Sequence, residues 1–309
     1  MTAPTGTFLT TSAIGNREDL SDIIYRISPT ATPFMNLASK GKATNTLHEW
    51  QTQDLAAAVT NNAAVEGDDA SGKTVTPTVR LSNRTQISTK TVVVSGTQQS
   101  MNSAGRKDEM GYQTSLAALE IKRDMESSAT QLDVTATAPR QVRGLLGWCY
   151  DNSSNGGGSY VAASYTGNTG QTNGTTRAFT ESQVKSVLQL IYTAGGEPDT
   201  IMMPPAMKQT FSTFTGNATR MDKSEDGKLY SSIEIYVSDF GEIKAVPNRF
   251  MRTRDVFVLQ SDKWAISYLR PFTTIDLAKT GDAEQKQLIV EWTVEARAPK
   301  ANGAIFDLA

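Results

Sequence analysis

The side chains that most often carry out catalysis are scarce in this sequence. His48 is the only histidine, and it lies in the strand-like segment TLHEWQ, so any catalytic triad with a histidine would have to use it. We expect a strand histidine with a satisfied hydrogen bond. Cys149 is the only cysteine, and because no nearby residue supplies an activating base we expect a buried small hydrophobic side chain. One histidine and one cysteine also fall short of a tetrahedral zinc site.

Acidic and glycine-rich stretches offer the remaining chemistry. Glu66, Asp68 and Asp69 could hold a cation, but their spacing lacks the EF-hand pattern, so we expect a solvated loop tip. The run 156–158 of three glycines is followed by Ser159, which indicates a flexible loop and no phosphate cradle. Spacing singles out no carboxylate pair for acid–base work. We therefore expect a protein that is not an enzyme and has neither cofactor nor metal; a cytosolic hydrolase that uses carboxylates is an alternative without a favoured site.

Length, composition and charge are those of a globular chain. The 309 residues are 38% hydrophobic and 20% charged, which is enough for a real core. The formal net charge of −2 gives no electrostatic reason to bind nucleic acid or an anionic membrane directly. The first twelve residues lack the pattern of a signal peptide, and no stretch approaches the roughly 18 apolar residues of a membrane helix. A single cysteine excludes an intrachain disulfide and fits a reducing cytosol.

The first 45 residues have the pattern of an arm. EDLSDIIYRISPTATPFMN starts with a helix-like apolar edge, and Pro29 and Pro33 then force extended backbone. No sequence nearby could form a core around this edge. Either the helix packs on its own domain, or its partner belongs to another copy of the protein, and we favour the second interpretation.

Residues 46–97 change to a strand pattern. TLHEWQ alternates in polarity, and TQISTKTVVVSGT is rich in β-branched residues. The stretch 56–80 between them is small, polar and punctuated by glycine. We expect two long strands joined by a mobile tip. Because an isolated two-stranded ribbon is only marginally stable in water, it needs a surface to lie on.

The strongest helix pattern spans about residues 108–134. Lys122 and Glu126 stand at i,i+4, the spacing of a surface ion pair. At 1.5 Å per residue the helix would be roughly 40 Å long, which indicates a structural spine. Apolar residues recur at spacings of mostly three and four: Leu116, Leu119, Ile121, Met125, Ala129 and Leu132.

The second half predicts a small α/β lobe and a return to strands. Residues 151–176 are rich in Gly, Ser, Asn and Thr and predict a long surface loop. Thr180 and Gln183 form a capping box before a helix that ends at Gly195. TIMMPP predicts a short buried strand, and AMKQTFSTF a further helix. We expect three hairpins after this lobe, in SIEIYVSDFGEIKAVP, DVFVLQSDKWAISYLRPF and TIDLAKTGDAEQKQLIVEWTVEARAP.

This order of segments resembles the Hong Kong 97-type major capsid protein fold of tailed bacteriophages, an α+β fold. In particular it resembles a phage capsid family whose members begin with a stretch similar to REDLSDIIYRISPTATPFMNLASKGKATNTLHEW. They also carry motifs similar to NRTQISTKTVVVSGT, LRPF and LAKTGDAEQKQLIVEWTVE. The resemblance covers essentially the whole chain and is weakest in residues 151–176.

The resemblance implies a division of the chain into four parts. Residues 1–45 would be the N-terminal arm, and 46–97 the extended β-hairpin loop that in this fold lies across an adjacent subunit. Residues 98–142 with 263–309 would form the peripheral domain around the spine helix. Residues 143–262 would form the α/β axial domain, which points to the centre of a hexamer or pentamer.

The resemblance also implies a function. The chain would be a major capsid protein that self-assembles as hexamers and pentamers into an icosahedral or prolate head around double-stranded DNA, bound without sequence specificity. Assembly would take place in the host bacterial cytoplasm, away from membranes, with scaffolding, portal and cement proteins as candidate partners. Another β-rich structural phage protein, a tail tube or an adhesin, is the alternative. The residues expected at contacts between subunits are Ile23, Ile24, Ile27, Phe34, Leu37, Trp50, Glu66, Asp68, Asp69 and Lys73.

Two maturation steps that occur in some capsids of this fold are not expected here. One is a crosslink from a lysine of the extended loop to a neighbour's asparagine. Lys73 and Lys90 lie in or near the loop, and we expect both to be solvated. The other is removal of an N-terminal scaffolding segment. The arm motif starts within the first 20 residues, so we expect no such loss, and the intact mass of the particle subunit tests this.

Overall fold

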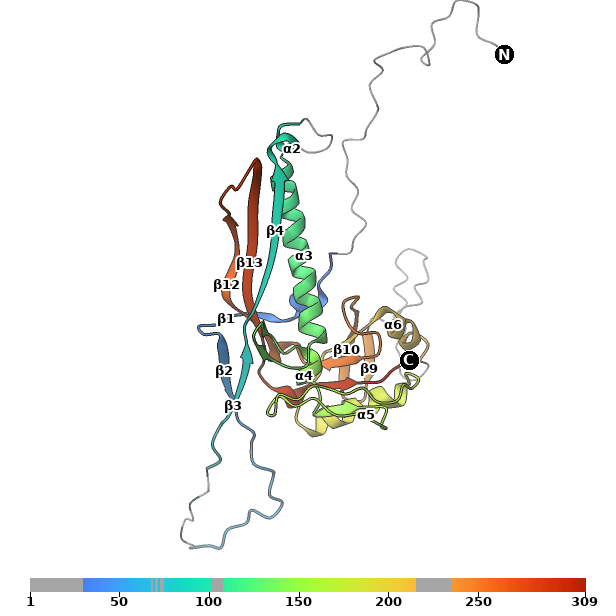
Figure 1. The fold of residues 1–309 in the computed structure, drawn as a ribbon. Coiled ribbons are helices and arrows are strands. Elements are labelled where there is room, and N and C mark those ends of the chain that lie inside the picture. Colours follow the sequence, from blue (N-terminus) through green and yellow to red (C-terminus); the bar gives the residue numbers. More distant parts are fainter. Residues whose placement is uncertain (1–29, 68, 70–71, 73–74, 102–107, 215–234) are drawn as a thin grey trace, which may run out of the picture.

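The computed structural model describes residues 30–67, 69, 72, 75–101, 108–214 and 235–309. They form an elongated part made of a sheet and a long helix, a compact lobe at its lower end, and a ribbon that ends in a projecting loop (Figure 1). The short helix expected before Pro29 lies outside the described residues.

A four-stranded sheet forms the elongated part. Its order is β1 (Ser39–Lys42), β12 (Trp264–Asp276), β13 (Ala283–Ala296) and β4 (Gln86–Ser95). β12 and β13 are antiparallel and turn between residues 276 and 283, which confirms the last predicted hairpin. β4 pairs antiparallel with β13, and β1 joins the other edge in parallel with β12.

Helix α3 (Glu109–Gln131) runs along this sheet and confirms the predicted spine helix (Figure 1). Its buried stripe follows a spacing of four residues and packs on apolar side chains of β13. The stripe differs from the predicted face, because Leu116 and Leu119 are only half-buried. The buried apolar residues in this stripe are Ala117, Ile121, Met125 and Ala129.

The lobe is built on a six-stranded mixed sheet. Helix α5 (Glu181–Thr193) begins with the predicted capping box of Thr180 and Gln183 and packs against β7 and β14. Helix α6 (Pro205–Phe211) follows the predicted buried strand β8. Strands β9 and β10 form the predicted hairpin around Ser238–Gly241. The strand order is β7 (Asn152–Ser154), β14 (Gly303–Ile305), β11 (Val256–Leu259), β8 (Thr200–Met203), β10 (Gly241–Pro247) and β9 (Ile235–Ser238).

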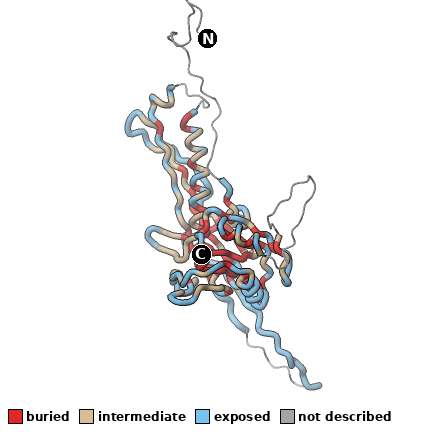
Figure 2. Tube along the Cα trace, turned by 90° about the vertical axis from the view of Figure 1, so that its right-hand side faces the viewer, coloured by how far each residue is buried: buried red, intermediate tan, exposed pale blue. Residues whose placement is uncertain are grey.

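The central strands of the lobe are buried on both faces. Ile201 and Met203 of β8 point into a core with α5, whereas Met202 between them points into a second core that includes Trp264 and Met125 of the elongated part. Figure 2 shows the buried residues gathered where the two parts meet. The six-stranded sheet therefore joins the lobe and the elongated part into one packed body.

The ribbon is shorter than the sequence predicts. It consists of β2 (Leu47–Thr52) and β3 (Val79–Arg84), which pair antiparallel. The segment TQISTKTVVVSGT was expected to extend it, and this prediction is wrong because the segment forms β4 of the four-stranded sheet. Thr85 marks the change, since its buried hydroxyl donates to Glu291 Oε1 over 2.8 Å. After Thr85, every second side chain of β4 faces α3 and is less exposed than its neighbours along the strand.

Two further expectations differ from the structure. DVFVLQSDKWAISYLRPF does not form one hairpin, because β11 lies in the six-stranded sheet and β12 in the other, with the 3₁₀-helix η2 (Ser261–Lys263) between them. Four consecutive buried residues in β11 suit a strand covered on both faces. Strand β14 lies in the lobe sheet, although residues 263–309 were assigned to the peripheral domain.

Short elements connect these parts. The segment 151–176 contains β7 and otherwise only isolated bridges, such as Val161 with Thr172. Asp307 accepts hydrogen bonds from the backbone N–H groups of Gly156 and Gly174 and so fastens this segment to the C-terminal end of the lobe. The remaining elements are α1 (Pro33–Leu37), α2 (Gly96–Ser100), β5 (Ala136–Thr137), β6 (Arg140–Gln141), α4 (Leu145–Trp148) and η3 (Pro299–Ala301).

Candidate assembly surfaces

His48 contacts a carboxylate and no nucleophile. Its Nε2 lies 3.2 Å from Glu295 Oε2, and Ser267 Oγ donates to the same oxygen over 3.1 Å. The hydrogen bond from His48, helped by those from Arg297 and Ser267, lowers the pKa of Glu295 to about 2 against the opposing effect of burial. Because the serine and the histidine both bond to the carboxylate, they lack the direct link that a catalytic triad requires. The predicted hydrogen-bonded strand histidine is confirmed.

Cys149 is fully buried, as predicted, and burial raises the pKa of its thiol well above the usual value. Among the described residues, no group of three or more His, Cys, Asp and Glu side chains is arranged to hold a metal ion. In the same residues, no helix is both long and apolar enough to cross a membrane. Because Cys149 is fully buried, its thiol packs as a small hydrophobic side chain.

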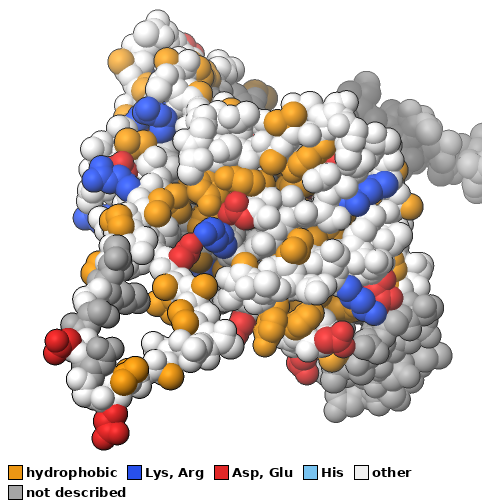
Figure 3. All heavy atoms as spheres, turned by 90° about the horizontal axis from the view of Figure 1, so that it is seen from below, with side chains coloured by type: hydrophobic (Ala, Val, Ile, Leu, Met, Phe, Trp, Pro, Cys, Tyr) orange, Lys and Arg blue, Asp and Glu red, His pale blue; other side chains and the backbone are white. Residues whose placement is uncertain are grey.

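The extended loop, residues 53–78, is the most exposed part of the described chain. Every described residue in it is exposed, including Leu55 at 97%, Val65 at 75% and Val75 at 81%. Figure 3 shows the loop standing away from the body, with apolar side chains along it and acidic side chains at its far end. Glu66 and Asp69 are exposed there. Apolar side chains held this far from their own core point to a surface that another molecule covers.

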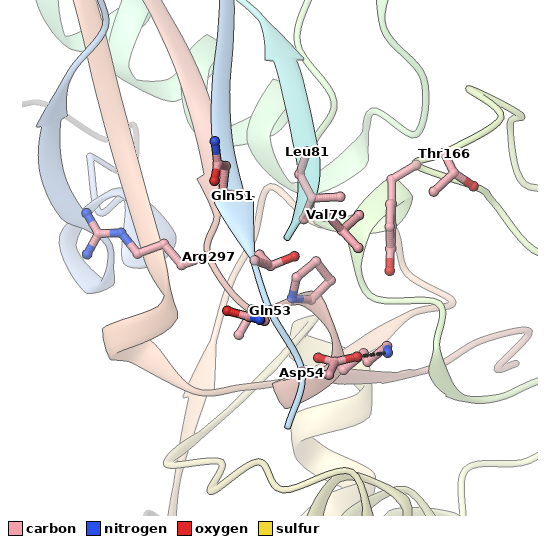
Figure 4. Close-up of a pocket in the computed structure, with 12 residues that line it drawn as sticks. Gln51, Gln53, Asp54, Val79, Leu81, Thr166 and Arg297 are labelled. Carbon is pink, nitrogen blue, oxygen red and sulfur yellow. Dashed lines mark hydrogen bonds and ion pairs between the residues drawn. The ribbon is translucent and has the colours of Figure 1, made fainter. Parts of the chain in front are cut away.

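A pocket of about 400 Å³ opens where the loop leaves the body (Figure 4). Gln51 of β2 and Val79 of β3 line one side, and Arg297 comes from the segment after β13. Asp54 at the start of the loop forms an ion pair with Lys300. This pair ties the root of the loop to the body and leaves the rest of the loop free to reach outward.

The structure corrects one predicted contact residue. Phe34 is fully buried, and its ring meets that of Trp264 edge to face at 5.7 Å, so it packs on its own subunit. Leu37 and Trp50 are half-buried against the same core, and Trp50 Nε1 donates to the backbone oxygen of Ala296 over 2.9 Å. Their contact with a neighbour stays a prediction. The predicted residues outside the described part of the chain are Ile23, Ile24, Ile27, Asp68 and Lys73.

The described end of the N-terminal arm is fastened to the spine helix by Glu126. Its carboxylate accepts the backbone N–H groups of Phe34 (2.7 Å) and Met35 (2.9 Å), and Asn248 Nδ2 donates to it over 2.6 Å. Burial raises the pKa of this carboxyl. The i,i+4 spacing predicts a surface pair of Glu126 with Lys122, and this role of Glu126 cannot be inferred from that spacing. Its position beside Met125, inside the buried stripe, was the available signal.

An elongated sheet with a spine helix, an α/β lobe and an exposed loop without a core define a structural subunit of the Hong Kong 97 capsid class. Residues 3–309 match the family model of the SU10 major capsid protein, so the chain belongs to this family. It is a major capsid protein of a tailed phage and a component of the virion. This confirms the predicted function in place of the tail-tube and adhesin alternative.

Individual relatives agree with this family. The chain is 30% identical to the major capsid protein of Escherichia phage Phieco32 over 338 residues, which cover 96% of this chain and 95% of the relative. The structure is similar to the Cyanophage A-1(L) capsid asymmetric unit, with a TM-score of 0.63, 16% identity and coverage of 97% and 98% of the two chains. It is also similar to the capsid of a native GTA particle, with a TM-score of 0.65, 11% identity and 96% of each chain covered. The predicted α+β capsid fold is confirmed.

Proposed function

We propose that this capsid protein self-assembles as hexamers and pentamers, and that these form a closed icosahedral or prolate shell around double-stranded DNA. The observation that carries the proposal is the extended loop, whose apolar side chains Leu55, Val59, Val65 and Val75 are 71–97% exposed in the single subunit. Burial of apolar surface is worth roughly 25 cal/mol per Å². A neighbouring subunit that covers the loop would gain this free energy.

The N-terminal arm would be a second segment through which each subunit contacts its neighbours. Glu126 fixes the chain at Phe34 and Met35, and the 29 residues before Thr30 carry the apolar edge with Ile23 and Ile27. An arm and a loop together could cover more than the usual interface of about 1,600 Å². Because each subunit would give and receive several such contacts, individually weak contacts add up through multivalency.

Charge supports a role as the wall of a DNA container. The formal net charge of −2 on 309 residues makes the subunit neither strongly attractive nor strongly repulsive toward packaged DNA. DNA would then be held without sequence specificity. Portal, scaffolding and cement proteins are the further partners that this role requires or allows, and assembly would occur in the host bacterial cytoplasm.

Negative-stain microscopy of the protein expressed alone and purified tests self-assembly. We expect closed shells or rings of capsomer size. A chain that stays monomeric at high concentration would contradict unaided self-assembly. Co-expression with a scaffolding protein would then show whether assembly depends on that partner.

A further inference from the structure

Asn–Gly pairs are sites at which a protein chain readily loses ammonia, because glycine has no side chain to keep its backbone nitrogen from the asparagine amide. The sequence contains three of them, Asn155–Gly156, Asn173–Gly174 and Asn302–Gly303. The glycine nitrogen attacks Cγ of the asparagine, a C–N bond forms, ammonia leaves and a five-membered succinimide ring remains. Water then opens this ring to aspartate or isoaspartate. Each pair is therefore a candidate site of modification.

Close packing around Asp307 requires the first two of these glycines. A Cβ atom at position 156 would clash with the backbone oxygen of Thr175, and one at position 174 would clash with that of Gly157. Both positions also lie against the side chain of Asp307. Because the fold cannot replace these glycines with bulkier residues, any restraint on the reaction has to come from other groups.

One buried carboxylate holds both reactive nitrogens. Gly156 N donates to Asp307 Oδ2 over 3.1 Å, and Gly174 N donates to Oδ1 over 2.8 Å. Asp307 is fully buried, and its Oδ1 also lies 2.8 Å from Arg254 Nη2. Its backbone oxygen accepts the N–H of Arg177 over 2.8 Å. Each glycine N–H is therefore directed at a carboxylate that the lobe keeps in place.

This carboxylate opposes cyclisation in two ways. The glycine nitrogen must lose its proton to react, and a negative charge at hydrogen-bond distance disfavours the anion that results. The nitrogen must also leave a hydrogen bond to a charged group, which is stronger than one between neutral groups. Asn173 depends most on the restraint, because Arg252 donates to its Oδ1 and polarises the amide for attack.

The third pair is held by different contacts. Asn302 is fully buried, its Oδ1 accepts Trp264 Nε1 over 2.8 Å, and its Nδ2 donates to the backbone oxygen of Ala298 over 2.9 Å. Gly303 lies in β14, between β7 and β11 of the six-stranded sheet. Because these contacts do not involve Asp307, the pair serves as an internal reference.

We propose that Asn155 and Asn173 are the deamidation sites of this subunit, and that Asp307 suppresses the reaction at both while the lobe is folded. Isoaspartate would add a methylene group to the backbone beside the carboxylate that fastens the segment 151–176. A segment that opens and reacts therefore cannot return to its original contacts. The proposal concerns the single subunit and is independent of self-assembly.

Peptide mass spectrometry after incubation at mildly alkaline pH tests the restraint. We expect Asp307→Asn to raise the deamidation rate at Asn155 and Asn173 about tenfold, which corresponds to about 1.4 kcal/mol of activation free energy. Asparagine keeps an acceptor oxygen and tolerates the left-handed backbone of this position (φ 62°), but it lacks the charge. The matched control, Ile201→Val in the core of the same lobe, should leave both rates unchanged. The rate at Asn302 should be the same in all three proteins.

Two results would overturn the proposal. One is an equal rate at Asn155 and Asn173 in Asp307→Asn and in the wild type. The other is a rise at Asn302 in this variant that matches the rise at the other two sites. A parallel rise would trace the effect to a general opening of the lobe and not to the loss of one carboxylate.

Hydrogen exchange in the wild type decides the question even if Asp307→Asn does not fold. At neutral and higher pH, exchange begins with the loss of the same N–H proton that cyclisation removes. We expect the amides of Gly156 and Gly174 to exchange at least about tenfold more slowly than that of Ser159, an exposed residue of the same segment. Exchange at Gly156 and Gly174 as fast as at Ser159 would show that Asp307 does not hold these nitrogens, and would overturn the proposal.

Discussion

At the scale of single residues, Glu126 joins three separate segments. The first N–H groups of a helix have no partner inside the helix, and in α1 two of them donate to this carboxylate. Asn248, from the segment after β10, donates to the same group. One buried carboxylate thus connects the arm, the spine helix and the lobe.

We expect Glu126→Ala to lower the free energy of unfolding by about 2–4 kcal/mol, because it leaves buried donors without an acceptor. Denaturant unfolding followed by circular dichroism measures this. Glu120→Ala on the same helix is the control. Glu120 is exposed and lies 3.7 Å from Lys90, and such surface pairs are worth less than about 1 kcal/mol. Equal losses in the two variants would contradict the role of Glu126 as a clamp.

Asp255 is a second buried carboxylate, and it makes the stability of the fold depend on pH. Its Oδ2 lies 2.9 Å from Arg252 Nε, and its side chain is 1% exposed. Burial raises its pKa to about 6, although Arg252 and Arg254 oppose the change and Asp307 adds to it. A raised pKa means that the folded state prefers the protonated carboxyl. Its contribution to stability is therefore full below about pH 4 and declines as the pH rises through 6.

We expect the difference in melting temperature between Asp255→Asn and the wild type to grow in favour of the variant from pH 4.5 to pH 7. The asparagine cannot ionise, whereas ionisation of the aspartate costs about 2 kcal/mol between pH 4.5 and pH 7. Thermal unfolding of both proteins at several pH values measures the slope. A difference that stays constant with pH would show that Asp255 titrates normally.

At the scale of elements, the extended loop should be separable from folding. None of its described residues is buried, so it adds little to the stability of a single subunit. We expect replacement of residues 56–75 by a short glycine turn to leave the melting temperature nearly unchanged and to abolish shells. Circular dichroism and negative-stain microscopy measure the two effects. Shells from the shortened chain would contradict the role of the loop in assembly.

Elements governed by local signals could be predicted from the sequence. The spine helix has a regular apolar spacing, α5 has its capping box, and the β9–β10 turn has its glycine. These signals lie within a few residues of one another along the chain, so tertiary contacts had little to override.

Strand partners could not be predicted in the same way. β4 has the same β-branched composition whether it pairs with β2 or with β13, and the choice depends on α3 covering one of its faces. β11 and β12 are neighbours in sequence, but only packing places them in different sheets. The roles of Phe34 and Glu126 also depend on contacts about 90 residues apart along the chain. The exposure of Glu66 and Asp69 near the loop tip could be predicted because it follows from local composition, and their contact with a neighbour stays a prediction.

At the scale of the whole molecule, two cores that share one sheet make a stiff body. The six-stranded sheet sends alternate side chains into each core. The described residues of the extended loop, by contrast, lie outside both cores. A subunit of this kind can keep its own fold whatever the loop contacts, since every described residue of the loop is exposed (Figure 2).

The contacts of Lys90 bear on how the subunits of the shell are held together. Lys90, one of two lysines considered for a crosslink, lies on β4 with its Nζ 3.1 Å from Asp124 and 3.7 Å from Glu120 of its own spine helix. These ion pairs hold the Lys90 side chain against its own spine helix, whereas attack on a neighbour's asparagine requires it to reach another subunit. We therefore expect mature particles boiled in denaturing detergent to give one band at the subunit mass. A ladder of multimers that disappears in Lys90→Arg particles would show that Lys90 does crosslink. A ladder that persists would assign the crosslink to another residue, and either ladder would contradict a shell held by non-covalent contacts alone.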